Sequence, residues 1–391
     1  MIQPISAGLI GAITGFASSF AIVIAGLRAV GATEEQAASG LLILCLTQGL
    51  VAIVLSWRFR MPLSFAWSTP GAALLVTAEA TTGDFSAAVG AFIVCGALIA
   101  VTGAWPALGR AITRIPRPIA SAMLAGILLP ICIAPVTASV AEPLLALPIV
   151  IVWLVLSRLA PRWAVPSAMI VTAIVVALSV GTGWLGAGVV APQLSFVPPS
   201  FDLLVIVSLG LPLFVVTMAG QNVPGFAVLS TLGFPPPRPA PILIGSGLVS
   251  MGGALFGGHV INLAALTAAI MAGPDAHPEH AKRWIAAVAG GAFYLVLGLG
   301  AGLATALVTA SPPILITAVA GLALIGAFIS SVTAALETPE HRPVAAITFL
   351  VVASGIVIGG IGSAFWGLVV GGLAMLWLGF RRRPAPARTA P

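Results

Sequence analysis

Charged side chains are almost absent from this sequence. Asp, Glu, Lys and Arg make up 7% of its 391 residues, while 60% are hydrophobic and the mean hydropathy is +1.17. Soluble globular domains contain about 25% charged residues, so the shortage excludes a soluble protein. Because most of the chain divides into apolar stretches of about 20 residues, the length of one membrane-spanning helix, we predict a polytopic membrane protein.

Cysteine is also scarce. Cys45, Cys95 and Cys132 are the three cysteines, and they lie within apolar stretches without the spacing of a metal site or a disulfide framework. The sequence contains no Gly-x-Ser-x-Gly motif and no phosphate-binding loop. We therefore expect no enzymatic activity, no metal and no cofactor. The net charge of +6 is explained by membrane topology, given below, and does not indicate nucleic-acid binding.

The apolar stretches predict an all-α protein with fourteen transmembrane segments. Segments 68–80 and 260–273 are too short to cross a bilayer completely as helices. The predicted segments are 5–27, 35–56, 68–80, 84–105, 118–134, 142–158, 163–183, 203–230, 240–256, 260–273, 283–309, 313–335, 343–360 and 363–380.

Basic residues orient these segments. With the N-terminus in the cytoplasm, all 16 Lys and Arg residues except Arg28 fall on the inside, as the positive-inside rule requires. Both termini are then cytoplasmic. We expect residues 384–391 to be a disordered tail and the basic residues before them to contact the lipid bilayer.

An odd number of segments in each half makes the two halves inverted repeats, 1–195 and 196–383. A weak internal similarity supports the repeat, because Arg117–Gly126 resembles Pro312–Gly321.

Residues Ser64–Ala73 form the least helix-like stretch of the first half. Small polar and aromatic residues alternate at its start, which is typical of an extended strand. Pro70 disfavours helix at Thr69 and suits the first turn of a new helix. We predict an extended piece, a break at Ser68–Thr69 and a half-helix running towards Ala78.

A second stretch, Gly257–Leu263, has the same character and leads into a half-helix that ends near Gly273. A broken helix leaves backbone groups unpaired, which is tolerated only where the break lines a cavity. There the free N–H groups and the positive helix end can hold an anion. Paired breaks in corresponding halves indicate a transporter's binding site; kinks in two ordinary helices are the alternative.

Gln221 and Asn222 are adjacent amides in the middle of segment 203–230. Such groups are costly in a membrane unless they are paired or functional. They either bind the substrate or form interhelical hydrogen bonds.

Hydroxyl and aromatic residues complete the candidate binding set. Ser18 and Ser19 lie at the matching place of the first segment and either face the substrate or bond back to their own helix. Phe16 and Trp67 either hold a flat ring or serve in packing.

Three residues are candidates for proton coupling. His259 is the only histidine close to the predicted site, and a membrane histidine can carry a proton or act as a fixed donor. Glu79 and Glu337 lie near segment ends and are further candidates.

Four motifs together resemble the benzoate/proton symporter family of bacterial inner membranes, over essentially the full length. They are Phe65–Leu74, Ala219–Gly225, Gly258–Leu263 and Glu337–Arg342. The chain is more distantly similar to the uracil and xanthine permeases. The resemblance implies a core domain, about 5–105 plus 203–309, and a gate domain, about 117–183 plus 313–380, with homodimers forming through the gate.

The resemblance also implies where the substrate binds. Acids of the nucleobase carriers fall on Gln221 and Ile261, and the loss of both carboxylates favours an anionic ligand. We expect proton-coupled uptake of benzoate or a related aromatic carboxylate, held near Ser68–Thr69 and Ile261–Asn262. The alternatives are a permease for nucleobases or other small organic anions, and an uncoupled anion channel.

Overall fold

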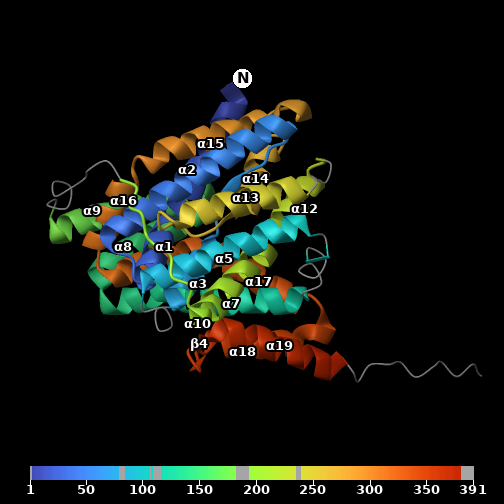
Figure 1. The fold of residues 1–391 in the computed structure, drawn as a ribbon. Coiled ribbons are helices and arrows are strands. Elements are labelled where there is room, and N and C mark those ends of the chain that lie inside the picture. The colour runs from blue at the N-terminus through green and yellow to red at the C-terminus, as the bar shows by residue number, and fades with distance from the viewer. Residues whose placement is uncertain are drawn as a thin grey trace, which may run out of the picture.

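The computed structural model describes residues 2–78, 84–105, 107–108, 116–181, 193–234 and 239–379. The molecule is mostly helical, with two pairs of very short strands (Figure 1). Within the described residues, seven helices are long and apolar enough to cross a membrane, or eight if one bent pair counts as a single span. Shorter apolar helices account for much of the remaining chain. Glu79 and the tail 384–391 lie outside the described residues.

One group of helices is built around contacts between small residues. Glycine allows close helix approach in membrane proteins, and a Cβ atom at Gly49 would lie only 2.7 Å from the carbonyl oxygen of Gly291. In this first helix group α2 packs on α15, α1 on α15, and α5 on α13. The helices are α1 (Ile2–Ala29), α2 (Glu34–Phe59), α5 (Phe85–Ala104), α13 (Pro239–Ala254) and α15 (Trp284–Gly298).

A second helix group packs around α7 and α17, and its helices α18 and α19 form the lower edge of the molecule in Figure 1. A Cβ atom at Gly126 would lie 2.7 Å from Cβ of Val352, so glycine permits the contact of α7 with α18. The short strands β3 (Val357–Ile358) and β4 (Ile361–Gly362) join α18 to α19. The group comprises α7 (Arg117–Ala141), α8 (Pro143–Leu159), α9 (Pro161–Val180), α17 (Pro313–Leu336), α18 (Arg342–Ala353) and α19 (Ser363–Gly379).

The predicted segment 203–230 is a continuous span, Leu203–Thr231, but two of its turns are π-helical. The second, η3, covers Met218–Asn222 and ends two residues before Pro224, whose nitrogen cannot donate to the previous turn. π-helical turns widen a helix locally and are common at functional sites. The successive pieces are α10 (Leu203–Val205), η2 (Ile206–Gly210), α11 (Leu211–Thr217), η3 and α12 (Val223–Thr231).

The predicted segment 283–309 is bent in the structure. It consists of α15 and α16 (Ala301–Ala310), with a bend of 57° between them. Gly298 and Gly300 flank the break. Glycine weakens a helix interior, and a Cβ atom at Gly298 would come within 3.0 Å of Cβ of Cys45. The close approach to α2 at this point therefore requires glycine.

Two extended segments from distant parts of the chain pair at the centre of the fold. β1 (Phe65–Trp67) and β2 (Ile261–Leu263) are antiparallel, with Ala66 opposite Asn262. Each strand leads directly into a half-helix, α3 (Thr69–Thr77) or α14 (Ala265–Ala272). Since the strands run in opposite directions, the half-helices start at opposite ends of the strand pair and point away from it. Their positive N-terminal ends therefore both face the middle of the molecule.

Candidate functional site

Ser68 caps the first half-helix. Its hydroxyl oxygen accepts a hydrogen bond of 3.1 Å from the backbone N–H of Gly71, and Pro70 occupies the first turn. A second hydrogen bond of 2.8 Å comes from the hydroxyl of Thr217 on α11. The tip of α3 is thus tied to the π-helical span that carries Gln221.

The second half-helix has no side-chain cap, because the residue before it is Ala264. The N–H groups of its first turn are therefore not occupied by a capping side chain, and they are available to a ligand. Its position is set by hydrogen bonds to neighbouring segments: Ala264 N–H donates to the Ser64 carbonyl at 3.0 Å, and the Thr267 and Ser64 hydroxyls lie 2.7 Å apart.

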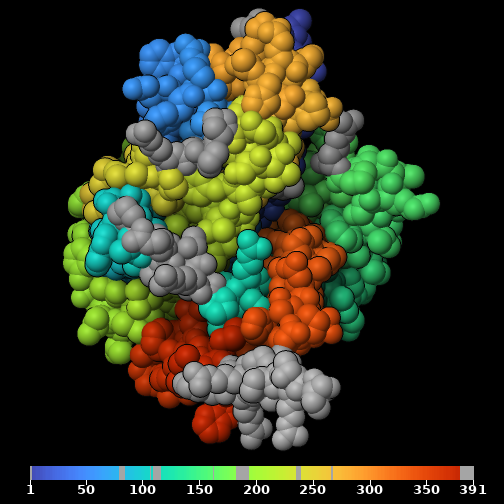
Figure 2. Space-filling model, turned by 90° about the vertical axis from the view of Figure 1, so that its right-hand side faces the viewer, coloured from blue at the N-terminus to red at the C-terminus, as the bar shows by residue number. Residues whose placement is uncertain are grey.

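A cavity of about 650 Å³, here called the central cavity, connects both half-helix tips with the second helix group. Thr69 and Pro70 contribute from α3, and Ala265 from α14. Figure 2 shows a hollow where the yellow-green surface of α12 faces the orange surface of α17, in agreement with the cavity's lining by Pro224 and by residues of α17. No charged side chain belongs to the described lining of this cavity.

Gln221 lines the central cavity from η3. Its side chain forms no hydrogen bond with another described residue, although it is partly buried. An amide in this position can donate to a ligand oxygen without first breaking an internal bond.

The predicted aromatic residues Phe16 and Trp67 and the hydroxyl of Ser19 contact one another. Trp67 donates through its indole nitrogen to the Ser19 hydroxyl at 2.8 Å, and Ser19 bonds to the Gly15 carbonyl at 3.1 Å. The ring of Phe16 contacts Trp67 edge-on at 5.8 Å. Of these predicted residues, only Ser18 is among those lining the central cavity.

Asn222, unlike its neighbour Gln221, is fully buried against β2. Its side-chain oxygen accepts a hydrogen bond of 3.0 Å from the backbone N–H of Leu263. Ile261 is held in turn by Ser250, whose hydroxyl accepts its N–H at 3.0 Å. Asn262 is also buried, and its side-chain oxygen has no partner among the described residues. All three predicted residues thus belong to the strand pair and its support.

His259 is buried just before β2, with its ring edge-on to Phe92 at 6.3 Å. Neither ring nitrogen forms a hydrogen bond within the described part of the chain. Glu337 is exposed at the end of α17, away from the strand pair. The hydrogen bond from Lys282 lowers the pKa of the exposed Glu279 carboxyl. The described residues contain no cluster of three metal-ligating side chains.

Several site residues were missed from the sequence. Ser121 of α7 and Ser330 of α17 face the central cavity from the second helix group. Neither hydroxyl forms a hydrogen bond with another described residue. Their helices look like ordinary apolar spans, so no local signal marks them. Thr217 had one available signal, since it lies one helical turn before Gln221.

A helical membrane bundle in which two half-helices point their positive ends at one cavity is typical of membrane transporters. The chain belongs to the benzoate membrane transport protein family, whose sequence profile matches residues 1–377. It is therefore a membrane transporter and not an enzyme.

Two curated relatives cover nearly the whole chain. The inner membrane protein YdcO of Escherichia coli K12 is 39% identical over 374 residues, covering 95% of this chain and 95% of the relative. The benzoate membrane transport protein of Acinetobacter baylyi is 33% identical over 373 residues, covering 94% and 93%.

Solved structures support the transporter fold. The transmembrane domain of the cyanobacterial bicarbonate transporter BicA matches with a TM-score of 0.60 at 15% identity, covering 95% of this chain and 98% of that domain. SLC26A9 matches with a TM-score of 0.64 at 14% identity, covering 97% and 66%.

Proposed function

We propose that the protein imports benzoate or a closely related aromatic carboxylate, together with a proton, by alternating access. One observation carries the proposal. Two half-helix N-termini and an unpaired amide meet at one cavity, in a chain of the benzoate membrane transport family.

The ligand carboxylate binds between the half-helix tips, near Ser68–Thr69 on one side and Ile261–Asn262 and Ala265 on the other. Each helix N-terminus acts as about half a positive charge. Since no acidic side chain belongs to the described lining, nothing there opposes an anion. Gln221 donates a hydrogen bond to the carboxylate.

The ring of the ligand lies against the apolar part of the same cavity. Pro70 and Leu124 provide this surface directly. Phe16 and Trp67 support this surface from behind. Ser18, on the same helix as Phe16, lines the cavity, and Ser19 holds the Trp67 indole. Asn222 keeps β2 in register. An apolar surface opposite an electropositive point suits an amphipathic anion better than a fully hydrated one.

Alternating access follows from the division into two helix groups. The first group, together with the span Leu203–Thr231 and both half-helices, is the core; the second is the gate. The central cavity lies between them, so a rocking motion of one against the other exposes it to either side. We place the protein in the bacterial inner membrane with both termini in the cytoplasm, as a homodimer through the gate.

His259 is the proposed proton carrier. It immediately precedes the strand that pairs with β1, so a change in its charge acts on the segment that positions both half-helices. Glu79 and Glu337 are the secondary candidates.

Uptake of labelled benzoate into proteoliposomes, with and without an inward proton gradient, tests the proposal. Protein-free vesicles supply the blank, because the neutral acid crosses lipid unaided. We expect saturable accumulation above the blank only with the gradient. Saturable uptake that does not depend on the gradient would contradict proton coupling. Non-saturable flux at channel rates would indicate an uncoupled channel. Competition by uracil against benzoate would indicate a nucleobase permease. If no uptake depends on the protein, benzoate is rejected as its substrate.

A further inference from the structure

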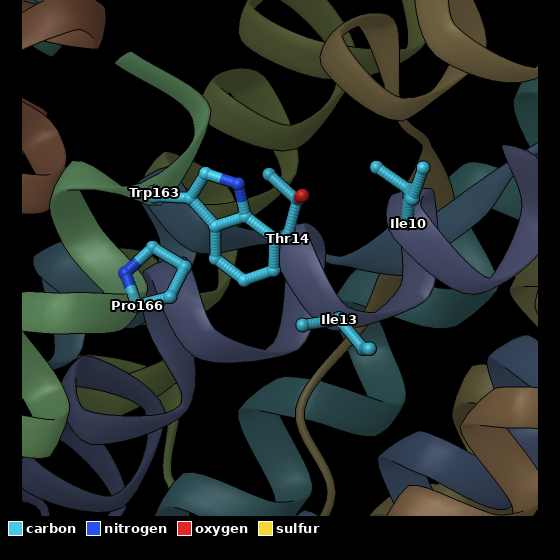
Figure 3. Close-up of a pocket in the computed structure, with 5 residues that line it drawn as sticks. All are labelled: Ile10, Ile13, Thr14, Trp163 and Pro166. Carbon is cyan, nitrogen blue, oxygen red and sulfur yellow. The ribbon is translucent and has the colours of Figure 1, made fainter. Parts of the chain in front are cut away.

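A small pocket of about 170 Å³ lies at the boundary between the two helix groups, apart from the half-helix tips. Its walls come from Ile10, Ile13 and Thr14 of α1 and from Trp163 and Pro166 of α9. Figure 3 shows the Trp163 indole between α9 and α1, with the two isoleucines on the opposite side. We call this space the side pocket.

The side pocket and the central cavity both border the same larger space. It shares Ile10, Thr14 and Pro166 with a larger space of about 820 Å³ that runs between the helix groups. This larger space shares Ser18 and Ala323 with the central cavity. The side pocket therefore lies beside the space that extends along α1 from the central cavity.

The size and walls of the side pocket suit a single aromatic ring. An apolar protein cavity of about 150 Å³ accommodates benzene. Ile10, Ile13 and Pro166 are apolar, and Trp163 offers an indole for an offset or edge-on contact. None of the five lining residues is charged.

One polar group gives the pocket an orientation. The Thr14 hydroxyl makes no hydrogen bond to any other described residue, whereas the nearby Ser18 and Ser19 hydroxyls both donate to the Gly15 carbonyl. Thr14 is therefore free to bond to a ligand oxygen, and the ring then lies towards Trp163.

We propose that the side pocket is a second, transient binding site for a single-ring aromatic acid, occupied between the central cavity and the exit. The inference rests on the proposed function for its ligand class. Because the described lining of the pocket offers an apolar wall and one hydroxyl but no charged side chain, the pocket recognises the ring and tolerates the loss of the ligand's charge. The central cavity, in contrast, requires the carboxylate. Benzyl alcohol, a neutral compound with the same ring, therefore separates the two sites.

The direct test is ¹⁹F NMR of protein labelled with fluorotryptophan in lipid nanodiscs. The resonance that disappears in Trp163→Phe belongs to Trp163. The resonance that disappears in Trp57→Phe belongs to Trp57 and serves as the matched control. Trp57 is 60% exposed and Trp163 51% exposed, so both sense the lipid. We expect benzyl alcohol to shift the Trp163 resonance saturably and to leave that of Trp57 in place. Equal shifts of both would mean partition into lipid, and no shift would mean no site; either overturns the inference.

Transport supplies the second readout. Trp163→Ala removes one aromatic contact, so benzoate exchange at subsaturating concentration should fall by about 2- to 10-fold, with unchanged benzoate affinity at the central cavity. Trp57→Ala should leave exchange unchanged. Equal rates in both variants and the wild type would overturn the inference. If wild-type protein neither binds nor moves benzoate, the proposed function fails, and that result is independent of the benzyl alcohol shift.

Discussion

Thr217 donates a hydrogen bond of 2.8 Å to the hydroxyl of Ser68, the residue that caps the half-helix α3. The two residues are 149 positions apart in the chain. This contact joins the capped half-helix to the π-helical span, so the geometry of the proposed anion site depends on both.

Replacing Thr217 by valine should weaken substrate binding without unfolding the protein. Valine has nearly the same shape but removes the donor, and one hydrogen bond contributes about 0.5–1.5 kcal/mol. We expect KM for benzoate to rise by about 2- to 10-fold, measured as initial uptake into proteoliposomes. Thr217→Ser, which keeps the hydroxyl, should resemble the wild type. An unchanged KM in the valine variant would show that Ser68 is positioned without this bond.

Gln221→Glu should impair benzoate binding more than Gln221→Ala. Alanine removes one hydrogen bond to the ligand, whereas glutamate adds a negative charge beside the bound carboxylate in a cavity with low dielectric constant. Binding of labelled benzoate to purified protein measures both effects. Gln193→Glu, an exposed position, controls for the added charge. Wild-type affinity in folded Gln221→Ala would remove Gln221 from the site.

Asn222→Ala should act mainly on stability. Its side-chain oxygen accepts the buried N–H of Leu263, and an unsatisfied buried donor costs about 1–3 kcal/mol. We therefore predict a lower midpoint of thermal unfolding in detergent, while the exposed Gln193→Ala should leave the midpoint unchanged. A variant with wild-type stability and weakened benzoate binding would instead make Asn222 a direct ligand contact.

His259→Gln should separate transport from proton coupling. Glutamine keeps hydrogen-bonding capacity but cannot gain a proton, so uphill accumulation should disappear while benzoate exchange across the vesicle membrane persists. The measurement compares gradient-driven uptake with exchange in the same vesicles. His341→Gln, at the end of the short helix Pro339–His341 and outside the site, is the control. Retained accumulation in His259→Gln would assign the proton to another group.

The serines of the second helix group predict which substituted rings are accepted. Ser121 and Ser330 bring unpaired hydroxyls to the central cavity, so hydroxylated benzoates can gain a hydrogen bond there. Hydroxybenzoates should compete with benzoate better than the matching methylbenzoates. Alanine at both positions should reduce that preference by about 3- to 10-fold and leave benzoate itself unaffected. Equal competition by both ring types in the wild type would contradict this.

Local sequence determined the parts of this protein that depend on short-range chemistry. The scarcity of charge required a membrane environment. Pro70 marked the first turn of α3, but the expectation that its ring keeps Thr69 out of the helix is wrong, because Ser68 caps the helix and Thr69 is its first residue. The adjacent amides of Gln221 and Asn222 are costly to bury unpaired in a membrane, so they marked the middle of their span as a candidate site. In each case the physical cause lies within a few residues of its effect.

Only the tertiary structure decided how these pieces meet. The register of Ala66 with Asn262 and the bond between Thr217 and Ser68 join segments far apart in the chain. The Gln221 side chain faces the cavity, whereas the Asn222 side chain accepts a hydrogen bond from β2. Adjacent amides of equal polarity have no local feature that separates these roles. The difference arises because η3 turns one side chain towards the cavity and the other towards the strand pair.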